Sequence, residues 1–150
     1  MVSYSRKIAI RIQSRTENLQ QVRNFVAEAA REFGFSDDET SNIVLSVDEA
    51  CTNIIKHAYQ FATDRHISID ILRERNSFEV RIQDNGKPFD PESIRTPDLK
   101  EHLSHYRRGG LGVYLMRRLM DRVEYNFVPG KVNEVRLVKN LSPASMPVRR

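Results

Sequence analysis

A row of polar side chains interrupts an apolar helical pattern between residues 47 and 59. Glu49, Asn53 and His57 follow one another at intervals of four residues in V-D-E-A-C-T-N-I-I-K-H-A-Y. On a helix such residues lie on one side, one turn apart. An Asn53 amide oxygen suits Mg²⁺, and a Glu49 carboxylate could take a proton from a nucleophile. A solvated helix face would explain the same row, although Asn is a poor helix former, which favours a specific role.

A second candidate site begins at Asp84, in the segment D-N-G-K-P-F-D-P. Asn-Gly is a common turn, and a turn alone would explain the segment. A carboxylate at the end of a strand could instead accept a hydrogen bond from the exocyclic amine of a base, with Gly86 letting the ligand lie against the backbone. Such a group discriminates between ligands, because leaving it unpaired in a closed pocket costs about 1–3 kcal/mol.

The third candidate is a glycine cluster in R-R-G-G-L-G-V-Y-L, residues 107–115. Each glycine inside a helix costs about 1 kcal/mol relative to Ala, so Gly109, Gly110 and Gly112 require a reason. Glycines that lead into a helix N-terminus leave free N–H groups at the positive end of the helix dipole, a natural phosphate site. A flexible junction that allows close packing is the alternative.

Hydrophobic periodicity predicts the elements that must position these residues. We expect, in order, a strand at 7–13, helices at about 19–33 and 37–58, strands at 66–72 and 78–84, a helix at about 110–120 and strands at about 122–128 and 133–139. Thr16 could cap the first helix and Gly34 suits its C-terminal end. Ser36 and Glu39 form a capping box that begins the second helix.

Helices do not separate every pair of consecutive strands in this order. We therefore expect an α+β fold, a two-layer α/β sandwich with a mostly antiparallel mixed sheet and helices on one face. A chain of 150 residues favours a single domain. Its core would span about 7–140, and the tail at 141–150 would be flexible.

Residues 85–109 show no clear hydrophobic periodicity and contain three prolines and many charged side chains. A loop of this length in a compact domain is usually functional or disordered. His102 and His105 lie in it; a metal pair is conceivable, but solvated side chains are favoured. Lys100, Arg107 and Arg108 could add positive charge near a phosphate, although no specific role follows for the two arginines.

Composition excludes several classes of protein. The chain is 39% hydrophobic and 29% charged, with a net charge of +4 and one cysteine, Cys51. No apolar run is long enough to span a membrane, and the start lacks a signal peptide. Cys51 is expected to be buried, and a single cysteine excludes disulfides and a cysteine zinc cluster. These features predict a cytoplasmic protein that does not bind a membrane. Because the charges are interspersed, we expect no direct binding of nucleic acid.

The three candidates occur in a specific order: helical E-x-x-x-N, a strand ending D-x-G, a long loop, and G-G-L-G opening a helix. In this the chain resembles the ATP-binding domain of gyrase-type ATPases, histidine kinases and Hsp90, the Bergerat-type ATPase fold. It is most similar to the small bacterial anti-sigma-factor serine/threonine kinases, from about residue 8 to 139. Lys87-Pro88-Phe89 stands where many superfamily members have a second glycine, which favours this branch over histidine kinases.

The resemblance implies a role for each candidate residue. Asn53 would hold the Mg²⁺ that bridges the nucleotide phosphates, and Glu49 would be the general base. Asp84 would accept a hydrogen bond from the adenine amino group, with Gly86 beside the ring. Backbone N–H groups of Gly110, Leu111 and Gly112 would bind phosphates, residues 91–109 would form a lid over ATP, and His57 would support the site.

The resemblance also implies a function. The chain would be an ATP- and Mg²⁺-dependent serine/threonine kinase that phosphorylates an anti-anti-sigma protein with a STAS domain, sequesters a sigma factor and often forms a homodimer. A second hypothesis is a nucleotide-dependent switch that holds a partner without phosphorylating it. Glu49 argues against this, because a pure binder needs no base. An ATP-hydrolysing subunit of a larger machine is disfavoured by the lack of a transducer domain.

Overall fold

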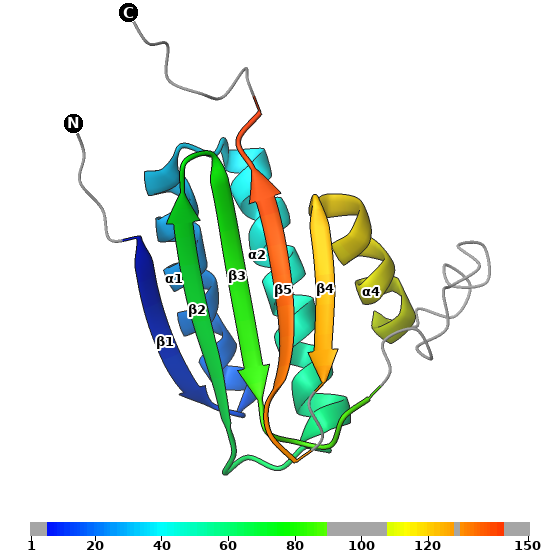
Figure 1. The fold of residues 1–150 in the computed structure, drawn as a ribbon. Helices are drawn as coiled ribbons and strands as arrows, with labels where there is room; N and C mark the ends of the chain where they lie inside the picture. Colours follow the sequence, from blue (N-terminus) through cyan, green and yellow to red (C-terminus); the bar gives the residue numbers. More distant parts are fainter. Residues whose placement is uncertain (1–5, 90–107, 128–129, 143–150) are drawn as a thin grey trace, which may run out of the picture.

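The computed structural model describes residues 6–89, 108–127 and 130–142, and for 108–113 it describes the backbone. The elements are β1 (Lys7–Gln13), the 3₁₀ turn η1 (Thr16–Asn18), α1 (Leu19–Phe33), α2 (Asp37–Asn53), the π turn η2 (Ile54–Ala58), β2 (His66–Glu74), β3 (Ser77–Asp84), α4 (Arg108–Leu119), β4 (Arg122–Phe127) and β5 (Asn133–Asn140). The helices cover one face of the sheet (Figure 1). This arrangement confirms the two-layer α+β sandwich.

The sheet has the strand order β1-β2-β3-β5-β4. All four neighbouring pairs are antiparallel, a more uniform sheet than the mostly antiparallel one expected. The last strand, β5, enters between β3 and β4 rather than joining an edge. This insertion places the start of β5 opposite the end of β3, where Asp84 lies.

Alternation along the strands determines which face the helices cover. The inward side chains of β2 and β3 are fully buried: Ile67, Ile69, Ile71, Phe78, Val80 and Ile82. They form one core with the apolar stripes of α1 and α2, and each such side chain contributes about 1.5–3 kcal/mol by leaving water. The intervening residues, such as Glu79 and Arg81, form ion pairs on the uncovered face.

The helix ends follow the sequence signals with one exception. Ser36 and Glu39 form the expected capping box at the start of α2. Gly34 ends α1 with a left-handed φ of 114°. The prediction that Thr16 caps α1 is wrong, because Thr16 begins the turn η1 and α1 starts only after Asn18. None of the helices in the described part of the chain combines the length and apolar character needed to cross a bilayer.

The helix α2 changes its winding directly after Asn53. Residues Ile54–Ala58 form a π turn, in which the N–H of Tyr59 donates to the carbonyl of Ile54 over 2.9 Å. Short π turns often occur at functional sites. Here the turn brings the carbonyl of Ala58 within 2.8 Å of the N–H of Lys87, which ties the end of the helix to the segment after β3.

Candidate functional site

Two of the predicted residues, Asn53 and Asp84, meet at one small internal space, which we call the α2–β3 chamber. Its lining consists of Ala50, Asn53, Ile54, Asp84, Phe89, Tyr125, Phe127, Asn133, Glu134 and Val135. The chamber measures about 10 Å³, roughly the room that one water molecule needs. Three aromatic rings form one wall, so a nucleobase could enter only if that wall moved.

Asn53 is the last residue of α2, and its side chain is 2% exposed. Its Nδ2 atom has no hydrogen-bond partner among the described residues. A buried polar group left unpaired costs about 1–3 kcal/mol, so a native structure rarely keeps one without a reason. The unpaired NH₂ group therefore fits a ligand that offers an acceptor such as an anionic oxygen, and the amide oxygen is the atom that could bind a cation.

Asp84 ends β3 and is 6% exposed. Its Oδ1 accepts two hydrogen bonds of 2.9 Å, from Asn133 Nδ2 and from the N–H of Gly86. Burial raises the pKa of the Asp84 carboxyl above its ordinary value of 3.8, and the two hydrogen bonds act in the opposite direction. The chamber thus contains a desolvated carboxylate that is held in one orientation.

Gly86 is in close contact with the end of the π turn. A Cβ atom at this position would lie 2.5 Å from the carbonyl oxygen of Ala58 and 2.8 Å from Cδ1 of Tyr59. The packing of the protein against itself is therefore sufficient to require glycine here. The predicted contact of Gly86 with a ligand stays a prediction.

Sequence reasoning missed two residues of this site, Asn133 and Tyr59. Asn133 binds both Asp84 and the carbonyl oxygen of Gly86. The Tyr59 hydroxyl accepts from the N–H of Asn85 over 3.1 Å and contacts the carbonyl of His66. Neither residue had a local signal, because each role depends on contacts between segments distant in the sequence.

Glu49 lies on α2 one turn before Asn53 and is half-buried, outside the lining of the chamber. Its neighbour Asp48 projects differently and accepts a 2.8 Å hydrogen bond from Arg23 of α1. The two adjacent carboxylates therefore have different surroundings. The Asp48 carboxylate thereby links α1 to α2.

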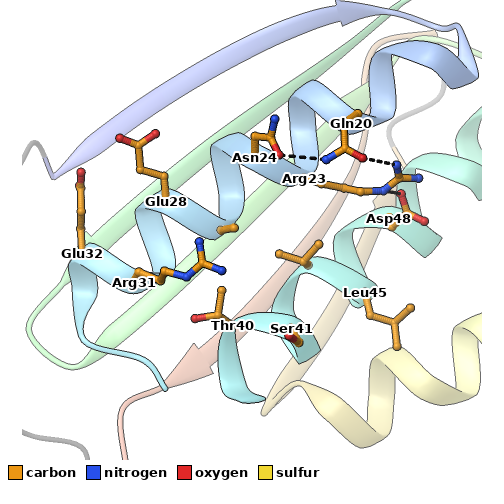
Figure 2. A pocket seen from close by; sticks show the side chains of 12 residues that line it. Gln20, Arg23, Asn24, Glu28, Arg31, Glu32, Thr40, Ser41, Leu45 and Asp48 are labelled. Carbon is orange, nitrogen blue, oxygen red and sulfur yellow. Dashed lines mark hydrogen bonds and ion pairs between the residues drawn. The ribbon is translucent and has the colours of Figure 1, made fainter. Parts of the chain in front are cut away.

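A larger hollow lies between α1 and α2 (Figure 2). It has a volume of about 830 Å³ and is lined by polar side chains of α1 such as Gln20, Arg23 and Glu28 and by side chains of α2 such as Leu45. Although its size matches a small-molecule pocket, none of the predicted site residues lines it. The chemistry of the side chains, rather than the size of the hollow, therefore identifies the α2–β3 chamber as the candidate site.

His57 lies on the π turn against the ring of Phe89, with 5.4 Å between ring centroids. Phe89 in turn contacts Phe127 at 6.0 Å. Burial, and secondarily the charge of Lys56, lowers the pKa of His57 below 6.5. The imidazole packs on the aromatic wall, and the supporting role of His57 stays a prediction.

The glycine cluster belongs to α4, which begins at Arg108, two residues earlier than predicted. Gly110 and Leu111 therefore lie in its first turn, where backbone N–H groups lack partners within the helix. Gly112 follows directly. Gly109 is helical as well.

Several predicted features fall outside the described residues: the lid through Arg107, with Lys100, His102 and His105. Within the described residues, no group of three or more His, Cys, Asp or Glu side chains could hold a metal ion. Cys51 is buried as expected, and burial raises the pKa of its thiol to about 12. Such a thiol stays protonated and is a poor nucleophile.

Comparison with known proteins agrees with this geometry. The chain matches the family described as "Histidine kinase-like ATPase domain" over residues 12–139. It is 31% identical to serine-protein kinase RsbW of Bacillus cereus (strain AH820), over 83% of this chain and 79% of that protein. It is 32% identical to RsbW of Listeria monocytogenes serovar 1/2a (strain ATCC BAA-679 / EGD-e), over 87% and 85%.

One solved structure, the SiaB–SiaC complex from Pseudomonas aeruginosa, contains a chain with the same fold. It superposes with a TM-score of 0.66 over 89% of both chains, at 13% sequence identity. At this identity the likeness concerns the fold alone.

Proposed function

The chain belongs to the histidine kinase-like ATPase domain family, in its anti-sigma-factor kinase branch, and from this premise we propose which reaction it performs. The protein transfers the γ-phosphoryl group of Mg·ATP to a serine or threonine hydroxyl of an anti-anti-sigma partner with a STAS domain. In the same proposal it sequesters a sigma factor and acts as a homodimer.

One observation carries the proposal: the same chamber is lined by a buried Asp84 carboxylate and by a buried Asn53, whose Nδ2 has no partner in the part of the chain that the structure describes. The unpaired Asn53 Nδ2 reduces stability, and so does the burial of the Asp84 carboxylate, which its two hydrogen bonds offset only in part. A nucleotide offers complementary groups for both: an exocyclic amine for the carboxylate, and for the Asn53 side chain a phosphate oxygen that accepts from its NH₂ group or a phosphate-bound cation that its amide oxygen binds. The order of α2, β3 and α4 along the chain is the order that the family resemblance requires.

The proposal gives each predicted residue a part in binding. Asp84 accepts from the adenine amino group, with Gly86 beside the ring. Backbone N–H groups of Gly110, Leu111 and Gly112 at the start of α4 bind the phosphates. Asn53 holds Mg²⁺, which neutralises phosphate charge when it is bound.

Glu49 is the proposed general base. It would accept the proton of the partner hydroxyl as that oxygen forms a bond to the γ-phosphorus, while the bond from phosphorus to the β–γ bridging oxygen breaks and ADP leaves. Catalysis then depends mainly on positioning and charge neutralisation, as in other phosphoryl transfers. The position of Glu49 outside the chamber suits a group that faces the acceptor hydroxyl rather than the adenine.

Nucleotide binding is tested by thermal unfolding with and without Mg·ATP. At 100 times the dissociation constant, ligand stabilises the protein by about 2.7 kcal/mol. We expect Asn53→Ala to lose the Mg²⁺-dependent part of the shift, whereas Asn24→Ala, at an exposed position of α1 outside the lining of the chamber, keeps it. An unshifted wild-type protein would remove the nucleotide site.

Phosphoryl transfer is tested with labelled ATP and candidate anti-anti-sigma proteins. Glu49→Gln should keep nucleotide binding and lose at least about 100-fold in transfer rate, in line with the contribution of a general base. Asp48→Asn is the matched control, since it neutralises the adjacent carboxylate. Transfer by Glu49→Gln at the wild-type rate would show that Glu49 is not the general base. Nucleotide-dependent binding of the partner without any transfer by wild type would instead favour the binding switch.

A further inference from the structure

Asn133 contributes to the chamber in a way that the reaction itself does not require. It is 3% exposed and stands opposite Asp84 in the β3–β5 register. Its Nδ2 donates to Asp84 Oδ1 over 2.9 Å and to the carbonyl oxygen of Gly86 over 3.0 Å. Since both neighbours can only accept, the amide has one possible orientation, with NH₂ toward them.

This arrangement gives the two carboxylate oxygens of Asp84 different hydrogen-bond partners. Oδ1 accepts from Asn133 and from the N–H of Gly86. No hydrogen bond joins Oδ2 to any residue in the described ranges 6–89, 108–127 and 130–142. The carboxylate therefore presents one oxygen to a ligand, although a free carboxylate can accept a planar, two-pronged donor at both.

We propose that Asn133 is a specificity-determining residue, which restricts Asp84 to a single acceptor and thereby selects adenine over guanine nucleotides. The inference rests on the proposed nucleotide-binding function and goes beyond it.

The two purines differ in the donors that they offer to this carboxylate. Adenine carries one exocyclic amine, which suits one carboxylate oxygen. Guanine offers two adjacent donors, its ring N–H and its amino group, which pair best with both oxygens of a carboxylate. With Oδ1 occupied by Asn133, a guanine would leave a buried donor unpaired, and sites discriminate strongly against ligands that leave polar groups unpaired.

Asn133 acts through Asp84, so it is a positioning residue. Its removal should change the ratio of the affinities for ATP and for GTP. Asn133→Ala frees Oδ1 of one of its two donors and loosens the carboxylate. Asn133→Thr supplies a hydroxyl in place of the amide and can donate one hydrogen bond to Oδ1. Asn133→Val has nearly the shape of that variant without its hydroxyl. Asn126→Ala is the matched control, since Asn126 is exposed on β4.

The experiment is isothermal titration of the full chain with Mg·ATP and Mg·GTP, together with denaturant unfolding of each variant. We expect wild type to prefer ATP, and Asn133→Ala to reduce the ATP-to-GTP affinity ratio by about tenfold or more, the effect of one hydrogen bond to a charged group. Asn133→Thr should recover most of the ratio, and Asn126→Ala should keep all of it.

Equal losses for both nucleotides in Asn133→Ala would overturn the inference, because a purely structural residue weakens both alike. Should Asn133→Ala fail to fold, the comparison of Asn133→Thr with Asn133→Val decides. A higher ATP-to-GTP ratio in Asn133→Thr supports the inference, because the two variants differ only in the donor to Asp84, and equal ratios overturn it.

The inference and the proposed function fail in different ways. A wild-type protein that binds neither nucleotide would refute the proposed function and this inference together. Binding of ATP with an unchanged ratio in Asn133→Ala refutes the inference alone.

Discussion

Asp84 and Asn133 face each other directly across the β3–β5 pair, and Asn133 Nδ2 donates to the Asp84 carboxylate over 2.9 Å. The contact is buried on both sides. It compensates only part of the desolvation of Asp84, since burial remains the largest influence on the pKa of that carboxyl and raises it. The protein therefore keeps at this point a charge that reduces its own stability, as binding sites often do.

The first prediction follows from the raised pKa of Asp84. Between the unfolded and the folded pKa values, the folded state holds the Asp84 proton more tightly, so stability falls as pH rises through that window. Asn at position 84 does not titrate and keeps an oxygen that can accept from Asn133 and Gly86. The stability of Asp84→Asn relative to wild type should therefore increase with pH and then level off. Denaturant unfolding over a pH series measures the difference in unfolding free energy between Asp84→Asn and wild type. A difference that does not change with pH would contradict a raised pKa of Asp84.

The second prediction separates two reasons for glycine at position 86: close packing against the carbonyl of Ala58, and contact with a ligand. The new methyl group of Gly86→Ala would lie 2.5 Å from the carbonyl oxygen of Ala58, a backbone atom. We expect unfolding without nucleotide to become easier by about 1–3 kcal/mol, the usual cost of overpacking. Gly130→Asn is the control, because Gly130 has open space around it and a φ of 75° that Asn tolerates. Unchanged stability in Gly86→Ala would show that the glycine serves only a ligand.

Local sequence signals predicted the elements well. Strict alternation at 7–13 and the capping box at Ser36 correspond to β1 and to the start of α2. Both signals depend on neighbouring residues and are readable from the sequence. The π turn after Asn53 was not predicted, because its geometry is stabilised by the contact of Ala58 with Lys87, in a distant segment.

The candidate site was predictable only in part, for the same reason. Asn53 stood out because Asn is a poor helix former inside a helix. Asp84 stood out because a carboxylate is unusual at the end of a buried strand. Asn133 begins β5 soon after a turn, where Asn is a common residue. Its role appears only when β5 pairs with β3. The placement of Glu49 outside the chamber likewise depends on how α2 packs, which the sequence spacing alone leaves open.

The third prediction concerns His57, whose pKa is lowered first by burial and then by the charge of Lys56. Phe89→Ala removes the ring that covers the imidazole, so water can reach it and the pKa should rise toward 6.5. Lys56→Ala should also raise it, by less. NMR titration of the His57 ring protons measures both, with Lys7→Ala on the edge strand as the control. An unchanged pKa in Phe89→Ala would mean that other groups desolvate the ring.

The last prediction concerns the ion pair between α1 and α2. Arg23 Nε lies 2.8 Å from Asp48 Oδ1, with the two side chains 38% and 24% exposed. Solvent screens a pair this accessible, so a double-mutant cycle with Arg23→Ala and Asp48→Ala should give a coupling of about 0.2–1 kcal/mol that weakens in salt. Arg31 and Asp37 form the control pair: they join the same two helices at 3.8 Å but are far more exposed, and their coupling should be smaller still. A coupling of Arg23 with Asp48 that is several times larger and insensitive to salt would show that the pair is desolvated in solution, and that the hollow beside it in Figure 2 is narrower than the structure has it.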